Sequence, residues 1–372
     1  MLTIDARYLA QPPSGIPRYT ANLLDAIRVA DPARKVRVLT HPVGPLPETL
    51  ANHGPFDVVV DAHRPRTPGE PLRWRKRLRR LRPSVLHCPD AFAPLWLGPR
   101  VAVTLHDAIP LKPELTHHAA RSKKERFRAV WRAWLRTQAR RADAVFTVSR
   151  HSADDLTRLL GLPPSKLHVL YNPVPPPDPP ENPTVPNHQD PNPADPPYLL
   201  CVGRFDPYKN AAGLVDAFAR LPEPLRLVFV GPLDPRFPEA QRRVAALGMR
   251  ERVAFRGAVD DATLHTLYAH AAALVMPSRY EGFGLPAIEA MHRGVPVVAS
   301  DGGALPEIVD DAALVVDATD PARLAAAIAR VIDEPTRRDA LVAAGRRRVR
   351  AFAPETIGVA YLEVIDRLAA LT

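Results

Sequence analysis

The stretch AALVMPSRYEGFGLPAIEAMHRGVPVVASD, residues 272–301, contains the alternation that decides the fold. An apolar run ends near Ser278, a glycine-rich loop follows, and Pro286 suits the first position of a helix that continues over about 287–293. VPVVAS is then a second apolar run. A strand, a helix and a strand in this order predict a βαβ unit of a parallel sheet.

The same alternation continues through both halves of the chain. Runs such as KVRVLTH and RVAVTLHD upstream, and YLLCVGR and LRLVFVG downstream, alternate with helical stretches near 209–221, 236–248 and 261–271. Between the halves, residues 174–197 are rich in proline, which removes backbone donors and favours extended chain. We therefore predict an α/β protein with two doubly wound, Rossmann-like domains facing across a cleft, 1–173 and 198–353, joined by a linker over 174–197.

Positive charge is concentrated in the first half of the 372 residues, which carry a net charge of +10. Residues 1–172 contain 29 Lys and Arg against 14 Asp and Glu, and the remainder contains 21 against 26. RWRKRLRRLR (73–82) and RSKKERFRAVWRAWLRTQARR (121–141) combine these cations with apolar residues at helical spacing. Both segments predict basic amphipathic helices.

Several classes of protein are disfavoured by composition. No apolar run approaches the ~18 residues of a membrane span, and the N-terminus lacks a signal-peptide pattern, so we expect a cytoplasmic protein. Cys88 and Cys201 lie in apolar strands without metal-ligand spacing, so we expect reduced thiols. The basic residues lie on helices of a Rossmann-like domain and no nucleic-acid module is recognisable, so we expect no nucleic-acid partner.

Candidate binding residues follow the strands of the second domain, because parallel sheets bind ligands beyond the carboxyl ends of their strands. CVGRFDPYKN places Arg204 and Lys209 after the first of these strands, where two cations near a helix start suit a diphosphate. The alternative is a solvated turn. In EGFGLPAIEA, Glu281 lies in the loop and Glu289 about one turn into the helix, where a carboxylate can accept hydrogen bonds from a vicinal diol such as that of ribose. The alternative is that Glu281 is an ordinary turn residue and Glu289 an exposed helix residue.

Two further candidates lie in the first domain. His106 ends the strand in VAVTLHDAIP, and Gly15 precedes a helix in PPSGIPRYTANLL, where it can bring backbone amides close to an anion. His106 is otherwise an ordinary strand-end histidine.

A dinucleotide-binding oxidoreductase is a competing interpretation, because Gly282 to Ala287 match GxGxxA and Asp301 follows at about the right distance for a ribose. That fingerprint requires a strand that runs directly into the first glycine, normally in the first βα unit of a domain. Here residues 279–281 intervene, late in the domain, so this interpretation is disfavoured.

Taken together, the motifs SGIPRYTANLL, TLHDAIP, TVSRHSADDL, VGRFDPYKN and MPSRYEGFGLPAIEAMHRGVPVVASDGGALPEIV resemble the retaining glycosyltransferases of family 4, which have the GT-B fold. The resemblance covers almost the whole chain, and Glu281 and Glu289 match the E-x7-E signature of the family. It implies that a C-terminal helix, about 354–372, crosses back to the first domain. It also implies that Arg204 and Lys209 bind the donor diphosphate, Glu289 the ribose and Glu281 the transferred sugar, with His106 near the reaction centre and Gly15 in a phosphate loop.

The chemistry expected from this resemblance is the transfer of a sugar from a nucleotide sugar with retained configuration. Charge that develops on the leaving diphosphate would be stabilised by Arg204, Lys209 and the backbone at Gly282, Phe283, Gly284 and Leu285. No Asp-x-Asp occurs in the sequence, so we expect no metal ion. The nucleotide sugar is a co-substrate in this scheme, and no cofactor is expected.

The partners are expected to be GDP-mannose as the first donor, and a glycan or polyprenyl-linked acceptor of surface-polysaccharide assembly. The basic half suggests reversible binding to an anionic membrane surface. A nucleotide-sugar epimerase or a phosphorylase of the same architecture is the alternative.

Overall fold

The computed structural model describes the chain except for residues 11–14, 44–55, 66, 68, 95–98, 116–120, 178–195 and 372, and it does not describe the side chains of residues 71, 72, 75 and 121–127. The chain forms two compact units. Unit 1 comprises Met1–Lys112, His118–Pro175 and Phe352–Thr372, and unit 2 consists chiefly of Pro176–Ala351. Most of the expected linker lies outside the described residues.

Unit 1 contains, in its described part, a parallel sheet of seven strands in the order β3-β2-β1-β4-β5-β6-β7. The order runs outward in both directions from β1 and β4, so the sheet is doubly wound as predicted. Its strands are β1 (Leu2–Asp5), β2 (Val36–Thr40), β3 (Phe56–Val60), β4 (Val85–Cys88), β5 (Arg100–Thr104), β6 (Ala144–Thr147) and β7 (Leu167–Val169). Its helices are α1 (Gly15–Ala30), α3 (Glu70–Leu81), α4 (Arg121–Arg141), α5 (Arg150–Leu160) and α13 (Pro354–Ala370).

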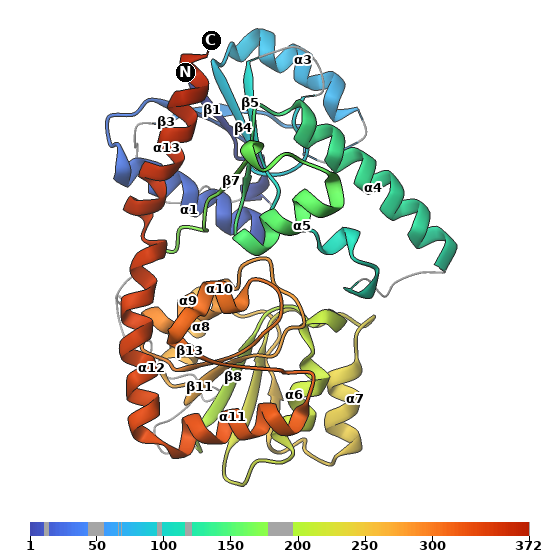
Figure 1. Cartoon of the computed structure of the whole chain (residues 1–372), viewed down its shortest axis with the longest axis vertical. Helices are drawn as coiled ribbons and strands as arrows, with labels where there is room; N and C mark the ends of the chain where they lie inside the picture. The colour runs from blue at the N-terminus through green and yellow to red at the C-terminus, as the bar shows by residue number, and fades with distance from the viewer. Residues whose placement is uncertain are drawn as a thin grey trace. The chain divides into compact units, whose positions relative to one another are not determined.

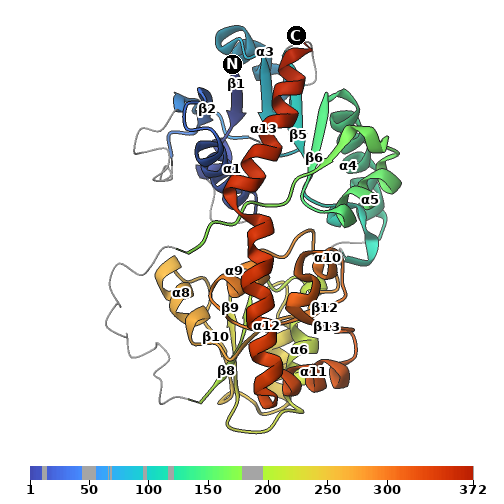
Figure 2. The same cartoon turned by 60° about the vertical axis from the view of Figure 1, so that its left-hand side comes forward.

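The last helix of the chain belongs to unit 1, where α13 lies along α1 (Figure 2). A Cβ on Gly358 would lie 2.1 Å from the backbone oxygen of Ala26, so the two helix backbones approach as closely as they do only because residue 358 is glycine. Where the chain enters α13, the backbone amide of Val174 donates to the carbonyl oxygen of Phe352 at 2.9 Å.

Unit 2 contains, in its described part, a parallel sheet of six strands in the order β10-β9-β8-β11-β12-β13. Strands β8, β11 and β13 of this sheet are labelled in Figure 1. This order reverses between β8 and β11, so the second unit is also doubly wound as predicted. The strands are β8 (Tyr198–Val202), β9 (Arg226–Val230), β10 (Val253–Phe255), β11 (Ala273–Met276), β12 (Val297–Ser300) and β13 (Ala313–Val316). The helices are α6 (Ala211–Phe218), α7 (Glu239–Ala246), α8 (Asp261–Ala269), α9 (Leu285–His292), α10 (Leu305–Val309), α11 (Pro321–Asp333) and α12 (Pro335–Arg348).

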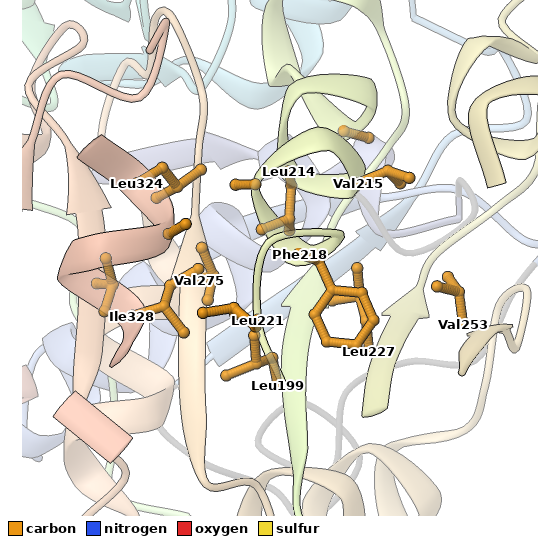
Figure 3. Close-up of a cluster of buried hydrophobic side chains, with 14 of the residues drawn as sticks. Leu199, Leu214, Val215, Phe218, Leu221, Leu227, Val253, Val275, Leu324 and Ile328 are labelled. Carbon is orange, nitrogen blue, oxygen red and sulfur yellow. The ribbon is translucent and has the colours of Figure 1, made fainter. Parts of the chain in front are cut away.

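Helices α6 and α11 cover one face of the second sheet (Figure 3). Phe218 and Leu214 of α6 and Ile328 of α11 are fully buried against strand residues such as Leu199 and Leu227. Every residue of β11 and of β12 is buried, which agrees with the long apolar runs expected of strands inside a parallel sheet. The α9 helix begins at Leu285, which places Pro286 second in the helix instead of first.

Both basic segments form the predicted helices, α3 and α4, but Trp74 and Trp134 on them pack against the rest of unit 1. Trp74 is completely buried, and the guanidinium groups of Arg7 and Arg77 lie 5.3 and 5.1 Å from the centre of its ring system. Trp134 donates from Nε1 to the backbone oxygen of Ala91 at 2.7 Å. Val130, one of the apolar residues at helical spacing on α4, is 69% exposed and does not pack on the sheet.

None of the helices in the described residues is long and apolar enough to cross a membrane. Cys88 and Cys201 are both unpaired thiols.

Candidate active site

The carboxyl ends of β8 and β11 lie at the point where the strand order of unit 2 reverses. Doubly wound sheets open a crevice at such a point, because the loops that follow the two strands lead to opposite faces of the sheet. A pocket is present here, and its lining includes Gly203, Arg204 and Lys209 from the first loop and Met276 and Ser278 from the second.

Lys209 and Glu281, which are 72 residues apart in sequence, form an ion pair at this pocket. The Lys209 ammonium donates to both carboxylate oxygens of Glu281, at 2.7 and 2.8 Å, and Ser278 Oγ donates to the same carboxylate at 2.6 Å. Burial opposes the charge of Lys209, but the adjacent Glu281 carboxylate outweighs it and raises the pKa of the lysine. Lys209 is therefore a fixed cation, with its position determined by Glu281.

Arg204 lines the same pocket but is held much less firmly. Its side chain is 60% exposed, and its Nε lies 3.0 Å from a carboxylate oxygen of Asp206. The guanidinium group can therefore turn toward an anion in the pocket without breaking a buried interaction.

Glu289 is a buried residue of α9, contrary to the alternative of an exposed helix position. The hydroxyl of Tyr268 on α8 donates to Glu289 Oε2 at 2.8 Å. The guanidinium of Arg293 lies 5.0 Å from the centre of the Tyr268 ring, and its Nη1 donates to the Glu289 carbonyl oxygen at 2.9 Å. Tyr268 thus holds one oxygen of the carboxylate and orients the other.

The loop that carries Glu281 is supported by the residues that follow β12. The backbone amide of Ala304 donates to the Glu281 carbonyl oxygen at 2.9 Å, and Ser300 Oγ donates to the carbonyl oxygen of Ser278. Gly303 has a φ of +65°, and a Cβ at this position would lie 2.4 Å from the Glu281 carbonyl oxygen and 2.5 Å from its amide nitrogen. Gly284, the residue before α9, also has a positive φ, of 110°. Gly282, Phe283 and Leu285 complete this turn into the helix.

In unit 1, His106 follows β5 and is half-buried. Its Nε2 donates to the carbonyl oxygen of Pro89 at 2.9 Å, and because a carbonyl can only accept, this bond fixes the proton on Nε2. The ring of Tyr19 packs edge-to-face on the imidazole, with ring centres 4.8 Å apart.

Gly15 is the first residue of α1, on the turn before Tyr19, and it is exposed. No described atom outside its neighbours lies within 4 Å of the place where a Cβ would be, so packing against the described residues does not require glycine there.

Sequence reasoning missed Ser278, Tyr268 and Tyr19. Ser278 had a usable signal, because it directly follows a strand at the same sheet edge as Lys209. Tyr268 and Tyr19 had none, because each is an aromatic residue on a helix whose spacing is also that of an ordinary core position.

The oxidoreductase interpretation fails on the local structure. Strand β11 ends at Met276, so five residues (277–281) separate it from Gly282, and β11 is the fourth strand of its unit along the chain. The dinucleotide fingerprint requires a strand that runs directly into its first glycine.

Comparison with known proteins identifies the family of this chain. Residues 13–177 match the family model described as Glycosyltransferase Family 4, and residues 186–348 match the model described as Glycosyl transferases group 1. O-antigen chain mannosyltransferase B of Escherichia coli is 29% identical over 377 residues, which cover 92% of this chain and 93% of that protein. The MMP alpha-(1->4)-mannosyltransferase of Mycolicibacterium hassiacum is 32% identical over 297 residues, which cover 74% of this chain and 68% of that protein. This chain belongs to glycosyltransferase family 4.

The fold of this glycosyltransferase is also that of solved structures. Anabaena Alr3699/HepE in complex with UDP and glucose matches it with a TM-score of 0.72 at 20% identity, over 99% of the glycosyltransferase chain and 100% of the HepE chain. Two parallel-sheet units with alternating helices, in a family 4 member, constitute the GT-B fold.

Proposed function

We propose that this glycosyltransferase moves a sugar from a nucleoside diphosphate sugar to a glycan or polyprenyl-linked acceptor, with retained configuration, without a metal ion and without a cofactor. The observation that carries the proposal is the Lys209–Glu281 pair at the strand-order reversal of unit 2, with Glu289 held by Tyr268 on the adjoining helix.

The roles of these residues follow from their chemistry. An ammonium has three N–H groups, of which Glu281 accepts two, so Lys209 can hold a phosphate oxygen while its position is still fixed. Arg204 adds a mobile guanidinium suited to bidentate binding of phosphate. We assign the ribose diol to Glu289 and the hydroxyls of the transferred sugar to Glu281.

Breaking the anomeric bond places negative charge on the leaving diphosphate. Fixed cations aimed at that charge lower the barrier most, because they need no rearrangement during the reaction. In our proposal Lys209 and the N-terminus of α9 supply this fixed positive potential, and the mobile guanidinium of Arg204 adds to it. Among the described residues, no three His, Cys, Asp or Glu side chains gather so that they could hold a metal ion.

Retention of configuration is proposed to occur by displacement on the same face of the sugar, with the leaving phosphate assisting the acceptor hydroxyl. We place His106 of unit 1 near the reaction centre in this scheme, and Gly15 beside the phosphates. Mannose from GDP-mannose is the first donor to test, because both relatives compared above are named mannosyltransferases. UDP sugars follow, because the Anabaena structure contains UDP and glucose.

The test is a thermal-shift screen of GDP-mannose, UDP-glucose, UDP-N-acetylglucosamine and dTDP-rhamnose, followed by NMR of the product formed from the best donor. A donor at 100 times its Kd stabilises the protein by about 2.7 kcal/mol, which raises the Tm by several degrees. We expect the donors that carry one particular nucleotide to give this shift. We expect the product to keep the anomeric configuration of the donor, and the activity to survive EDTA. An inverted product would refute retention, and loss of activity in EDTA with recovery in magnesium or manganese would refute the metal-independent scheme.

A further inference from the structure

A chain of four buried polar side chains crosses the interior of unit 1 from the last helix to the first. The hydroxyl of Tyr361 on α13 lies 2.9 Å from Nδ1 of His87 on β4, and Nε2 of His87 lies 2.9 Å from Oγ1 of Thr104 on β5. Thr104 Oγ1 in turn lies 3.1 Å from the hydroxyl of Tyr19 on α1. None of the four residues is more than 1% exposed.

This chain ends on the residue that contacts His106. The Tyr19 ring meets the His106 imidazole at an interplanar angle of 89°, which is an edge-to-face contact. The same imidazole donates from Nε2 to the carbonyl oxygen of Pro89. The ring of His106 is therefore held between a backbone acceptor and an aromatic ring whose own hydroxyl is anchored to Thr104.

The four groups act as one unit because of the state of His87. Burial, and in second place the neighbouring His106, lower the pKa of His87 to about 3, so the imidazole is neutral. A neutral imidazole donates from one nitrogen and accepts at the other, so His87 links the hydroxyls of Tyr361 and Thr104 as a donor to one of them and an acceptor from the other, whichever tautomer is present. Removal of one hydroxyl leaves a buried polar atom without its partner and breaks the chain for the members beyond it.

We propose that Tyr19, Thr104, His87 and Tyr361 are positioning residues for His106, and that α13 thereby determines the geometry of the reacting site in unit 1. This proposal rests on the role of His106 near the reaction centre in the proposed function. It assigns part of that role to a tyrosine that follows His106 by more than 250 residues.

Thr104 offers a matched pair of variants. Thr104→Val keeps the shape of the side chain and removes the hydroxyl, whereas Thr104→Ser keeps the hydroxyl and removes a methyl group. If Thr104 only fills space in the core, the two variants should have similar effects on His106. A positioning role predicts that only Thr104→Val alters His106.

The primary readout is the imidazole nitrogen spectrum of protein labelled with 15N-histidine, in which His106 is assigned by its loss in His106→Gln. We expect the His106 resonances to shift or broaden in Thr104→Val and to stay at the parental position in Thr104→Ser. With the donor found above, we expect kcat of Thr104→Val to be at least about tenfold below that of Thr104→Ser, with similar KM for the donor. Ile4→Val, which removes one methylene from a buried residue of β1, is the control for core packing and should resemble the parental protein in both measurements.

If the imidazole nitrogen resonances of His106 are the same in Thr104→Val and Thr104→Ser, the proposal is overturned, even if the two variants differ in turnover. If the parental protein turns over none of the nucleotide sugars, the proposed function fails, but the spectra still decide whether the chain positions His106. Should Thr104→Val not fold, Tyr361→Phe removes a single hydroxyl at the far end of the chain. An unshifted His106 spectrum in that folded variant would equally refute the proposal.

Discussion

Lys209 and Glu281 are both largely buried, with side chains 24% and 9% exposed, so each charge depends on the other for compensation. An exposed surface cation could be removed with little effect on stability, but Lys209 is not one. The side chain of Arg204 is exposed, so we expect removal of its charge to have little effect on stability. Loss of activity on mutation of Lys209 must therefore be separated from loss of folding.

We expect Lys209→Met to reduce the free energy of unfolding by about 3 kcal/mol, because it leaves a buried carboxylate unpaired. Adding Glu281→Gln removes that charge and should restore most of the stability but none of the transferase activity. Urea unfolding followed by circular dichroism, with turnover measured in parallel, checks both. A double variant that regains activity together with stability would show that the pair is structural only.

A second prediction at the residue scale concerns His87. Its pKa in the folded protein, about 3, is far below the ordinary value of 6.5 that it regains on unfolding. Below pH 6.5 the unfolded chain takes up a proton that the folded chain does not, so the stabilisation present above pH 6.5 is lost as the pH falls toward 3. The slope is about 1.4 kcal/mol per pH unit, and hence about 2 kcal/mol between pH 6.5 and pH 5.

This loss of stability at low pH should be absent in His87→Gln, because glutamine does not take up a proton in this pH range. All four tryptophans of the chain lie between residues 74 and 134, so tryptophan fluorescence during urea unfolding reports on unit 1. Equal pH dependence of unfolding in the parental protein and in His87→Gln would contradict the assignment of a neutral, buried imidazole.

At the scale of elements, the loop after β12 acts as a support for the loop after β11. Gly303→Ala should displace the Glu281 backbone, because the new Cβ would lie within 2.5 Å of it. A displacement of this kind at a reacting site reduces activity by on the order of 100-fold. Gly248→Ala is the matched control, since Gly248 has a φ of +66° but no described atom within 4 Å of its Cβ position.

Both alanine variants adopt the same unfavourable backbone conformation and should therefore lose similar stability from that source. Turnover and Tm are measured for both. Equal activities of Gly303→Ala and Gly248→Ala would mean that contact with the Glu281 backbone does not determine its position.

The sequence predicted elements better than it predicted contacts between side chains. Strands and helices follow from local periodicity, so the boundaries of α3, α4 and α9 were expected to within a few residues. Lys209 and Glu281 were placed at one end of the sheet because strand ends in parallel sheets share an edge, and no exact pairing followed from that rule. Tyr268 with Glu289 and Tyr361 with His87 depend on how helices pack on the sheet, which leaves no periodic signal in the sequence.

At the scale of the whole molecule, charge divides with the chain: residues 1–172 are strongly basic and the remainder is slightly acidic. On α3 the tryptophan is buried, while Lys76, Arg79 and Arg80 are exposed on one face of the helix. We therefore expect unit 1 to bind anionic membranes through charge and without insertion of tryptophan. Each such residue contributes roughly 1 kcal/mol near an anionic surface.

Replacing Lys76, Arg79 and Arg80 by Gln should weaken partition onto anionic vesicles by on the order of 100-fold at low salt. The control replaces three exposed arginines of unit 2, namely Arg220, Arg242 and Arg250, and removes the same total charge. Sedimentation with neutral and anionic vesicles, at low and high salt, measures the effect. Equal partition of the two triple variants, or of the parental protein onto both kinds of vesicle, would argue for an acceptor that is not presented at a membrane.

The place of α13 in unit 1 has a consequence for biosynthesis. A ribosome completes the sheet of the first unit long before it makes residues 354–370, and it makes the whole of the second unit in between. Until then the face of α1 that Gly358 will contact is uncovered, and His87 lacks its hydrogen-bond partner Tyr361. The unit that is translated first is thus the one that finishes folding last, and a nascent chain must shield its exposed helix until translation is nearly complete.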